Sequence, residues 1–168
     1  MQPVADVDSL IAKMADELQV RIQSLASEDV LMIGIHTGGV WIAERLHQIL
    51  KLSQPFGTLD ISFYRDDFSR IGMNPQVKPS TLPVAVEDKH IILVDDILHT
   101  GRTIRAAMNE IFDYGRPASI ILTVLGERSG RELPIQPDVV GTHLSLDSHE
   151  HVKLLGPDKL SLSVERTP

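Results

Sequence analysis

Residues 91–103, with the sequence "IILVDDILHTGRT", decide the fold class of this chain. The stretch begins as a short apolar run typical of a buried strand and continues through Asp95 and Asp96. It then reaches a turn around Gly101 that opens a helix. Free amides and the positive dipole end make a helix start a natural phosphate site. Because the two aspartates would repel a phosphate, the ligand must also offer groups that carboxylates can hold.

The same succession of apolar runs and amphipathic segments extends through the chain. The patterns predict helices over 7–25, 40–50 and 102–114, and strands over 30–35, 57–64, 90–96, 118–125 and 138–146. Strands that alternate with helices indicate an α/β fold with a mainly parallel sheet flanked by helices. No repeat or linker interrupts residues 1–168, so we expect a single domain.

Residues 65–83 do not fit either pattern. They include Gly72 and prolines at 75, 79 and 83, which prevent a long regular element. A loop of this length in a small domain is usually an active-site cover or disordered. We expect a flexible loop that covers the active site.

Composition excludes several classes of function. The chain has no cysteine, which excludes disulfides, thiolate catalysis and cysteine-ligated metals and fits a reducing compartment. It shows neither a secretion signal nor an apolar run near the ~18 residues of a membrane span, so we expect a cytoplasmic protein without a membrane partner. A net charge of −7 gives no overall attraction to nucleic acid.

The loops after two predicted strands carry the candidate chemistry. Ligands of open parallel sheets bind at the carboxyl ends of the strands, so "HTGG" at residues 36–39 and the turn at 100–103 should share one crevice. Ionised Asp95 and Asp96 accept hydrogen bonds only, so hydroxyl donors or a divalent metal are their natural partners. A sugar phosphate with a vicinal diol meets both demands. Alternatively, the aspartates are a solvated loop start that caps the helix.

The glycine patterns of two common nucleotide folds are absent. The chain contains neither G-x-G-x-x-G nor G-x-x-x-x-G-K-[ST], which disfavours a dinucleotide fold and a P-loop. Instead, "VDDILHTGRT" resembles the phosphoribosyl pyrophosphate (PRPP) signature of type I phosphoribosyltransferases. The stretches "LDISFYRDDFS", "GRPASI" and "RELPI" resemble the PyrR family, the pyrimidine operon attenuation regulators that also have uracil phosphoribosyltransferase activity. The resemblance covers roughly residues 10–144.

This resemblance implies a type I phosphoribosyltransferase fold, with a small hood and a flexible loop, that makes UMP and pyrophosphate from uracil and PRPP. Asp95 and Asp96 would bind the ribose hydroxyls. The 5′-phosphate would bind to Thr100, Gly101, Arg102 and Thr103, and the pyrophosphate to Thr37, Gly38 and Gly39. Mg²⁺ would bridge pyrophosphate and ribose oxygens without direct ligation by the protein.

The rest of the implied site concerns the base and the covering loop. Arg65, at the base of the 65–83 loop, is a candidate catalytic residue that would act as the loop closes and excludes water. The hood would be "VVGTHLSL", in which backbone groups of Val139, Val140 and Gly141 could read the base edge. The resemblance also implies a homodimer or a higher oligomer.

Some positions depart from the family pattern. Gly38 stands where an arginine is usual, His99 stands where a tyrosine is usual, and Thr142 and His143 stand where lysine and asparagine are expected. We interpret His99 as a simple loop residue. The altered hood leaves a purine phosphoribosyltransferase as an alternative.

A second alternative is a UMP-responsive RNA-binding attenuation regulator with little catalysis. In the family the first helix contributes to a basic RNA-binding face. Here that helix carries only Lys13 and Arg21 against Asp8, Asp16 and Glu17. Because RNA binding depends on cations that neutralise phosphates, we predict that RNA binding is weak.

Overall fold

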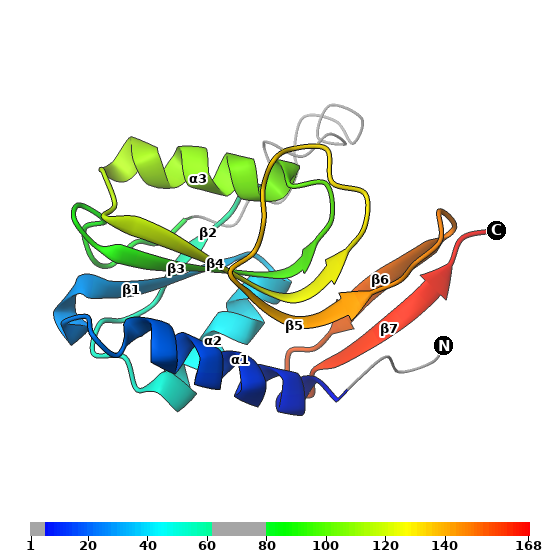
Figure 1. Ribbon diagram of the computed structural model, residues 1–168, viewed down its shortest axis with the longest axis horizontal. Helices are drawn as coiled ribbons and strands as arrows, with labels where there is room; N and C mark the ends of the chain where they lie inside the picture. Colours follow the sequence, from blue (N-terminus) through cyan, green and yellow to red (C-terminus); the bar gives the residue numbers. More distant parts are fainter. Residues whose placement is uncertain (1–5, 62–79) are drawn as a thin grey trace.

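The computed structural model describes residues 6–61 and 80–168. Its centre is a five-stranded sheet of order β2-β1-β3-β4-β5 in which all neighbours are parallel (Figure 1). The strands are β1 (Val30–Ile35), β2 (Gly57–Leu59), β3 (His90–Leu98), β4 (Ser119–Arg128) and β5 (Val139–Leu144). This confirms the predicted mainly parallel α/β sheet.

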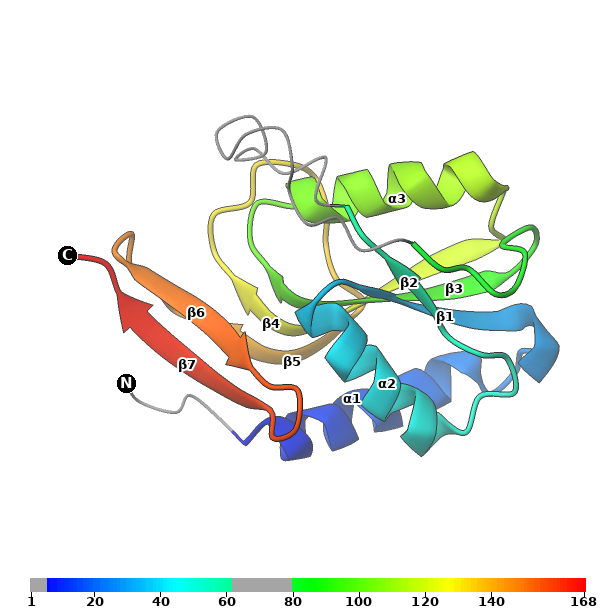
Figure 2. The same cartoon turned by 180° about the vertical axis from the view of Figure 1, so that it is seen from behind.

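Helices cover both faces of this sheet. A short 3-10 helix (Ser27–Asp29) leads into β1. Helices α1 (Val7–Ile22) and α2 (Gly38–Leu50) lie on one face, and α3 (Arg102–Tyr114) lies on the other (Figures 1 and 2). None of the helices within residues 6–61 and 80–168 is long and apolar enough to cross a membrane.

Strict alternation along the central strands separates two apolar clusters. In β3, Ile92 and Val94 pack in the cluster under α1 and α2, whereas Ile91 and Leu93 pack in the cluster under α3. Both sets are buried, which explains why β3 appears in the sequence as an unbroken apolar run.

A second, two-stranded antiparallel sheet follows the main sheet and was not predicted. It consists of β6 (Glu150–Leu155) and β7 (Ser161–Arg166). Leu154 and Leu162 bury their side chains in the cluster of α1 and α2. Arg45 of α2 donates to the carbonyl oxygens of Pro157 at 2.6 Å and Asp158 at 3.1 Å, which fixes the connection between the two strands.

The observed boundaries differ from the predicted ones near the ligand-binding edge. Helix α2 begins at Gly38, so both glycines of "HTGG" belong to its first turn. Strand β3 continues to Leu98, so the two aspartates lie within the strand. The segment expected to form the hood is β5, the edge strand of the main sheet. Arg65 and most of the predicted covering loop lie outside the described residues.

Candidate functional site

The two aspartates of β3 are oriented by the backbone that follows them. The amide of Asp96 donates to Oδ1 of Asp95 at 2.8 Å, and the amide of Ile97 donates to Oδ1 of Asp96 at 2.7 Å. The alternation of the strand changes phase here, because Ile97 packs with the cluster of α1 and α2 and Leu98 with that of α3. Asp95 is only 5% exposed. The two carboxylates are therefore held in a defined geometry.

The start of α2 lies directly against these aspartates. A methyl group added at Gly38 would lie 2.4 Å from Oδ2 of Asp96, and one at Gly39 would lie 2.6 Å from the carbonyl oxygen of Val94. Both distances are below van der Waals contact; at Gly39 the obstacle is backbone, so only glycine fits, whereas at Gly38 it is the side chain of Asp96. The glycine loop after β1 and the aspartates of β3 thus lie side by side, as predicted. An arginine at position 38 would displace the Asp96 carboxylate. The peptide bond between His36 and Thr37, at the entrance to this turn, is cis.

The turn at residues 100–103 forms the start of α3. Gly101 has φ +96°, a conformation that other residues rarely adopt. Oγ1 of Thr100 accepts a hydrogen bond of 3.2 Å from the amide of Arg102. The amides of the first helical turn have no carbonyl one turn earlier, so they and the helix dipole can bind an anion. The side chain of Arg102 points its Nε at Glu132 Oε1, 3.0 Å away.

The connection between β4 and β5 supports this turn. The amides of Glu132 and Leu133 donate to the carbonyl oxygen of Thr100 at 2.9 Å and 3.2 Å. Leu133 and Ile135 also pack against Gly101. The turn at residues 100–103, the predicted phosphate turn, is consequently held from one side by β3 and from the other by residues 132–135.

A pocket of about 260 Å³ opens at the carboxyl ends of β4 and β5. Its lining residues are Glu127, Arg128, Ser129, Gly130, Arg131, His143 and Leu144. His99 borders it, since a methyl group at Gly130 would lie 2.8 Å from Nε2 of His99. This contact partly covers the ring of an otherwise exposed side chain. Burial, followed by the charge of Arg128, lowers the pKa of His99 below 6.5.

The three predicted base-binding residues lie earlier in β5 than His143 and Leu144, which line this pocket. Val140 pairs with Val124, which in turn pairs with Asp95, so these residues lie side by side across the sheet. The carbonyl oxygen of Gly141 accepts a 3.5 Å hydrogen bond from Lys13 of α1. The pocket residues 127–131 were not predicted, although a charged run at the carboxyl end of a predicted strand is a usable signal.

The predicted PRPP residues fall into one region of the fold. Thr37, Gly38 and Gly39 lie at the start of α2, and Thr100, Gly101, Arg102 and Thr103 lie at the start of α3, with the aspartates of β3 between them. Within residues 6–61 and 80–168, no group of three or more histidine or acidic side chains is arranged to hold a metal. The carboxylates of Asp95 and Asp96 are the acidic groups closest to a ligand that carries Mg²⁺. Their oxygen atoms are of the kind that Mg²⁺ prefers.

Comparison with known proteins gives a consistent family. A family model for the phosphoribosyl transferase domain matches residues 4–159. The bifunctional protein PyrR of Nitrosococcus oceani is 59% identical over 167 residues, covering 98% of this chain and 94% of that protein. The bifunctional protein PyrR of Pseudomonas paraeruginosa is 54% identical over 153 residues, covering 91% and 90%.

Solved structures show the same fold at lower identity. The hypoxanthine phosphoribosyltransferase of Trypanosoma cruzi superposes with a TM-score of 0.72 at 17% identity, covering 100% of this chain and 98% of that one. The purine phosphoribosyltransferase of Pyrococcus horikoshii gives 0.62 at 26% identity, covering 83% of both chains. With the fold and the sequence matches in agreement, this chain belongs to the phosphoribosyltransferases and, among them, to the PyrR family.

Proposed function

We propose that this chain transfers the phosphoribosyl group of PRPP to uracil, giving UMP and pyrophosphate, and that it is a bifunctional regulator of the PyrR type. The observation that carries the proposal is the position of both helix starts beside the two aspartates. The start of α2 touches Asp96, and the start of α3 follows the same strand. Two anion-binding helix starts on either side of two carboxylates match a ligand with two phosphate-bearing ends and a diol between them.

Each part of the proposed site has one task in this reaction. Asp95 and Asp96 accept hydrogen bonds from the ribose 2′ and 3′ hydroxyls. Residues 100–103 bind the 5′-phosphate, and residues 37–39 bind the pyrophosphate as it departs. The reaction passes through an oxocarbenium-like state with a good leaving group, so orientation and charge neutralisation supply most of the rate. Mg²⁺ bound together with PRPP would neutralise part of the pyrophosphate charge, and the carboxylates of Asp95 and Asp96 are the protein groups nearest to such an ion.

The base is assigned to the pocket at the ends of β4 and β5. It adjoins the phosphate turn through His99 and Gly130, so a base held there can reach the ribose carbon. The PyrR relatives, at 51–59% identity, favour uracil over a purine, because the solved purine enzymes reach 26% identity or less.

One assay tests the assignment of the reaction. Consumption of PRPP should be measured with uracil, hypoxanthine, guanine and orotate under identical conditions with Mg²⁺. We expect turnover with uracil alone. Turnover with hypoxanthine or guanine instead would establish the purine alternative, and no turnover with any base would indicate a protein that only senses PRPP or UMP.

The regulatory partner of the proposed function is RNA, and we predict that its binding is weak. Both cations of α1 are engaged by the protein itself. Lys13 donates to the carbonyl oxygen of Gly141, and Arg21 contacts Asp138 through its carbonyl oxygen at 3.2 Å and its carboxylate at 4.0 Å. Two cations opposed by Asp8, Asp16 and Glu17 on the same helix give little counterion release.

Binding of a pyrimidine-leader hairpin, measured with and without UMP at physiological salt, tests this prediction. We expect dissociation constants in the micromolar range or weaker. Nanomolar binding that UMP enhances would contradict it and would make gene regulation the main function.

We also propose that the chain forms at least a homodimer. Large apolar side chains remain exposed on helices, namely Val20 of α1 and Phe112 and Tyr114 of α3. Light scattering at micromolar concentration should give at least twice the mass of one chain. A monomeric mass would contradict the proposal.

A further inference from the structure

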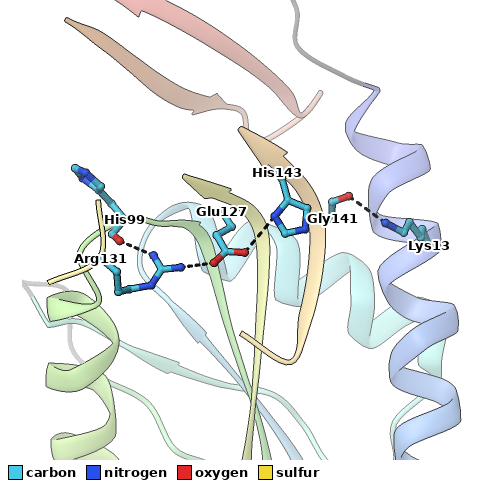
Figure 3. A network of polar contacts seen from close by, with 6 residues as sticks. All are labelled: Lys13, His99, Glu127, Arg131, Gly141 and His143. Carbon is cyan, nitrogen blue, oxygen red and sulfur yellow. Dashed lines mark hydrogen bonds and ion pairs between the residues drawn. The ribbon is translucent and has the colours of Figure 1, made fainter. Parts of the chain in front are cut away.

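Glu127 connects two parts of the site that lie on different elements. It is the second-last residue of β4, and its side chain is 20% exposed. Its two carboxylate oxygens have separate partners (Figure 3). Oε1 pairs with the guanidinium of Arg131, and Oε2 lies 3.2 Å from Nδ1 of His143 on β5.

Arg131 connects Glu127 to the phosphate turn at residues 100–103. Its Nη1 donates to the carbonyl oxygen of His99 at 2.5 Å, and His99 directly precedes Thr100. The carbonyl oxygen of Thr100 in turn accepts from the amides of Glu132 and Leu133. The chain of contacts therefore runs from the end of β4 to the backbone that opens α3.

The two ion pairs of the Glu127 carboxylate differ in their exposure to solvent. The His143 side chain is 79% exposed, and exposed ion pairs contribute little. The Arg131 side chain is only 24% exposed, so its pair with Glu127 is well shielded from solvent. A charge-assisted hydrogen bond in such a place restrains its partners more strongly than a surface pair does.

The phosphate turn depends on this support because its donors are mostly backbone amides, with the guanidinium of Arg102 beside them. The guanidinium of Arg102 is paired with Glu132, and both side chains are about half exposed. Binding of the phosphate then depends mainly on aligned backbone amides. These amides bind an anion most strongly when they already point at it before the ligand arrives.

We propose that Glu127 is a positioning residue for the 5′-phosphate, which acts by holding Arg131 against the carbonyl of His99. The inference rests on the proposed function, because it assumes that the 5′-phosphate binds at residues 100–103. Glu127 itself does not touch the phosphate. Its removal should weaken ligands that carry a 5′-phosphate and leave pyrophosphate, bound at the start of α2, unaffected.

The test compares Glu127→Ala and Glu127→Gln with the full-length wild type. We expect Glu127→Ala to raise the KM for PRPP and the Kd for UMP about tenfold, the usual loss for a charged hydrogen bond. The inhibition constant of pyrophosphate, which carries neither a 5′-phosphate nor a base, should stay within about twofold. Glu127→Gln keeps an acceptor for Arg131 and should show a smaller change, and it provides the measurement if the alanine variant does not fold.

A matched control removes a different carboxylate that pairs with a cation. Asp29 lies directly before β1, at the amino ends of the strands and away from the site. Its carboxylate is 3.8 Å from Nζ of Lys89. Asp29→Ala should leave all these constants unchanged. Unchanged UMP affinity in the Glu127 variants, or equal loss of UMP and pyrophosphate affinity, would overturn the inference. Failure of the wild type to bind UMP would instead overturn the proposed function on which it rests.

Discussion

The starts of α2 and α3 both require glycine, but for different physical reasons. At Gly39 the limit is space, since a methyl group would lie 2.6 Å from the backbone oxygen of Val94. A methyl group at Gly101 would have space, because its nearest neighbour would lie 3.4 Å away, but the residue has φ +96°. Glycine is thus required by a close contact at the first helix start and by a backbone conformation at the second. Two helix starts at the same end of one sheet can therefore require glycine for unrelated reasons.

The largest effect is expected at the carboxylates that lie between these two starts. Asp95→Asn combined with Asp96→Asn removes both charges while preserving the size of the side chains. Hydrogen bonds to charged groups contribute roughly 1.5–3 kcal/mol each, so turnover should fall by about a hundredfold or more. Steady-state kinetics measures this, with circular dichroism to verify the fold. Unchanged kinetics would remove the aspartates from the site.

The next effect is expected from alanine at Gly39 and Gly101, which tests the close contact and the positive φ separately. Gly39→Ala forces a methyl group against backbone and should cost about 1–3 kcal/mol, a fall in Tm of roughly 3–10 °C. Gly101→Ala should cost about 1–2 kcal/mol because of its positive φ. Differential scanning calorimetry provides both values.

Asparagine at the same two positions sharpens the comparison. Asn tolerates the left-handed region, so Gly101→Asn should be more stable than Gly101→Ala. At position 39 a larger side chain only worsens the clash, so Gly39→Asn should be less stable than Gly39→Ala. The same rank order at both positions would show that the two glycines serve one purpose.

The smallest effect concerns His99, which precedes the second start. Burial and the charge of Arg128 lower the pKa of His99 in the folded protein below 6.5. The unfolded chain therefore binds more protons near and below that pH, and stability is lost as pH falls through this range. The other charged groups that act on the ring are Glu132, which opposes the shift, and Arg131 and His151, which add to it.

His99→Gln removes this titration. Urea unfolding between pH 5 and 8 should show a slightly flatter loss of stability toward acid in the variant than in the wild type. The difference is expected to be small because the His99 side chain is largely exposed. A steeper acid loss in the variant would contradict the direction of the shift.

The sequence predicted those parts of the fold that depend on local pattern. The buried strands and the two helices after glycine turns follow from apolar spacing, and the proposed ribose and phosphate residues rest on "VDDILHTGRT". Strand β3 is longer than predicted because β4 pairs with it as far as Leu98. The contacts of Gly38 and Gly39 likewise depend on a neighbour distant in sequence, so no local pattern reports them.

The β6–β7 hairpin was missed although "LSLSVE" at residues 160–165 alternates apolar and polar residues as a half-buried strand does. Strand β6 is mostly half-buried or exposed, with Leu154 as its one buried residue. Its position is set by Arg45 and by packing against α1 and α2, which a linear pattern does not contain. The pocket beside His99 was missed for a similar reason, since it exists only where the ends of β4 and β5 meet the phosphate turn.

The central place of β3 also has a consequence for hydrogen exchange. Residues Ile92, Leu93 and Val94 are paired with β1 on one side and β4 on the other. Their amides should exchange with solvent only when the whole protein unfolds, whereas those of Gly101 to Thr103, at a helix start, should exchange through local opening. The aspartates thus extend from the slowest-exchanging part of the molecule, and ligand protection should be visible almost entirely at the phosphate turn.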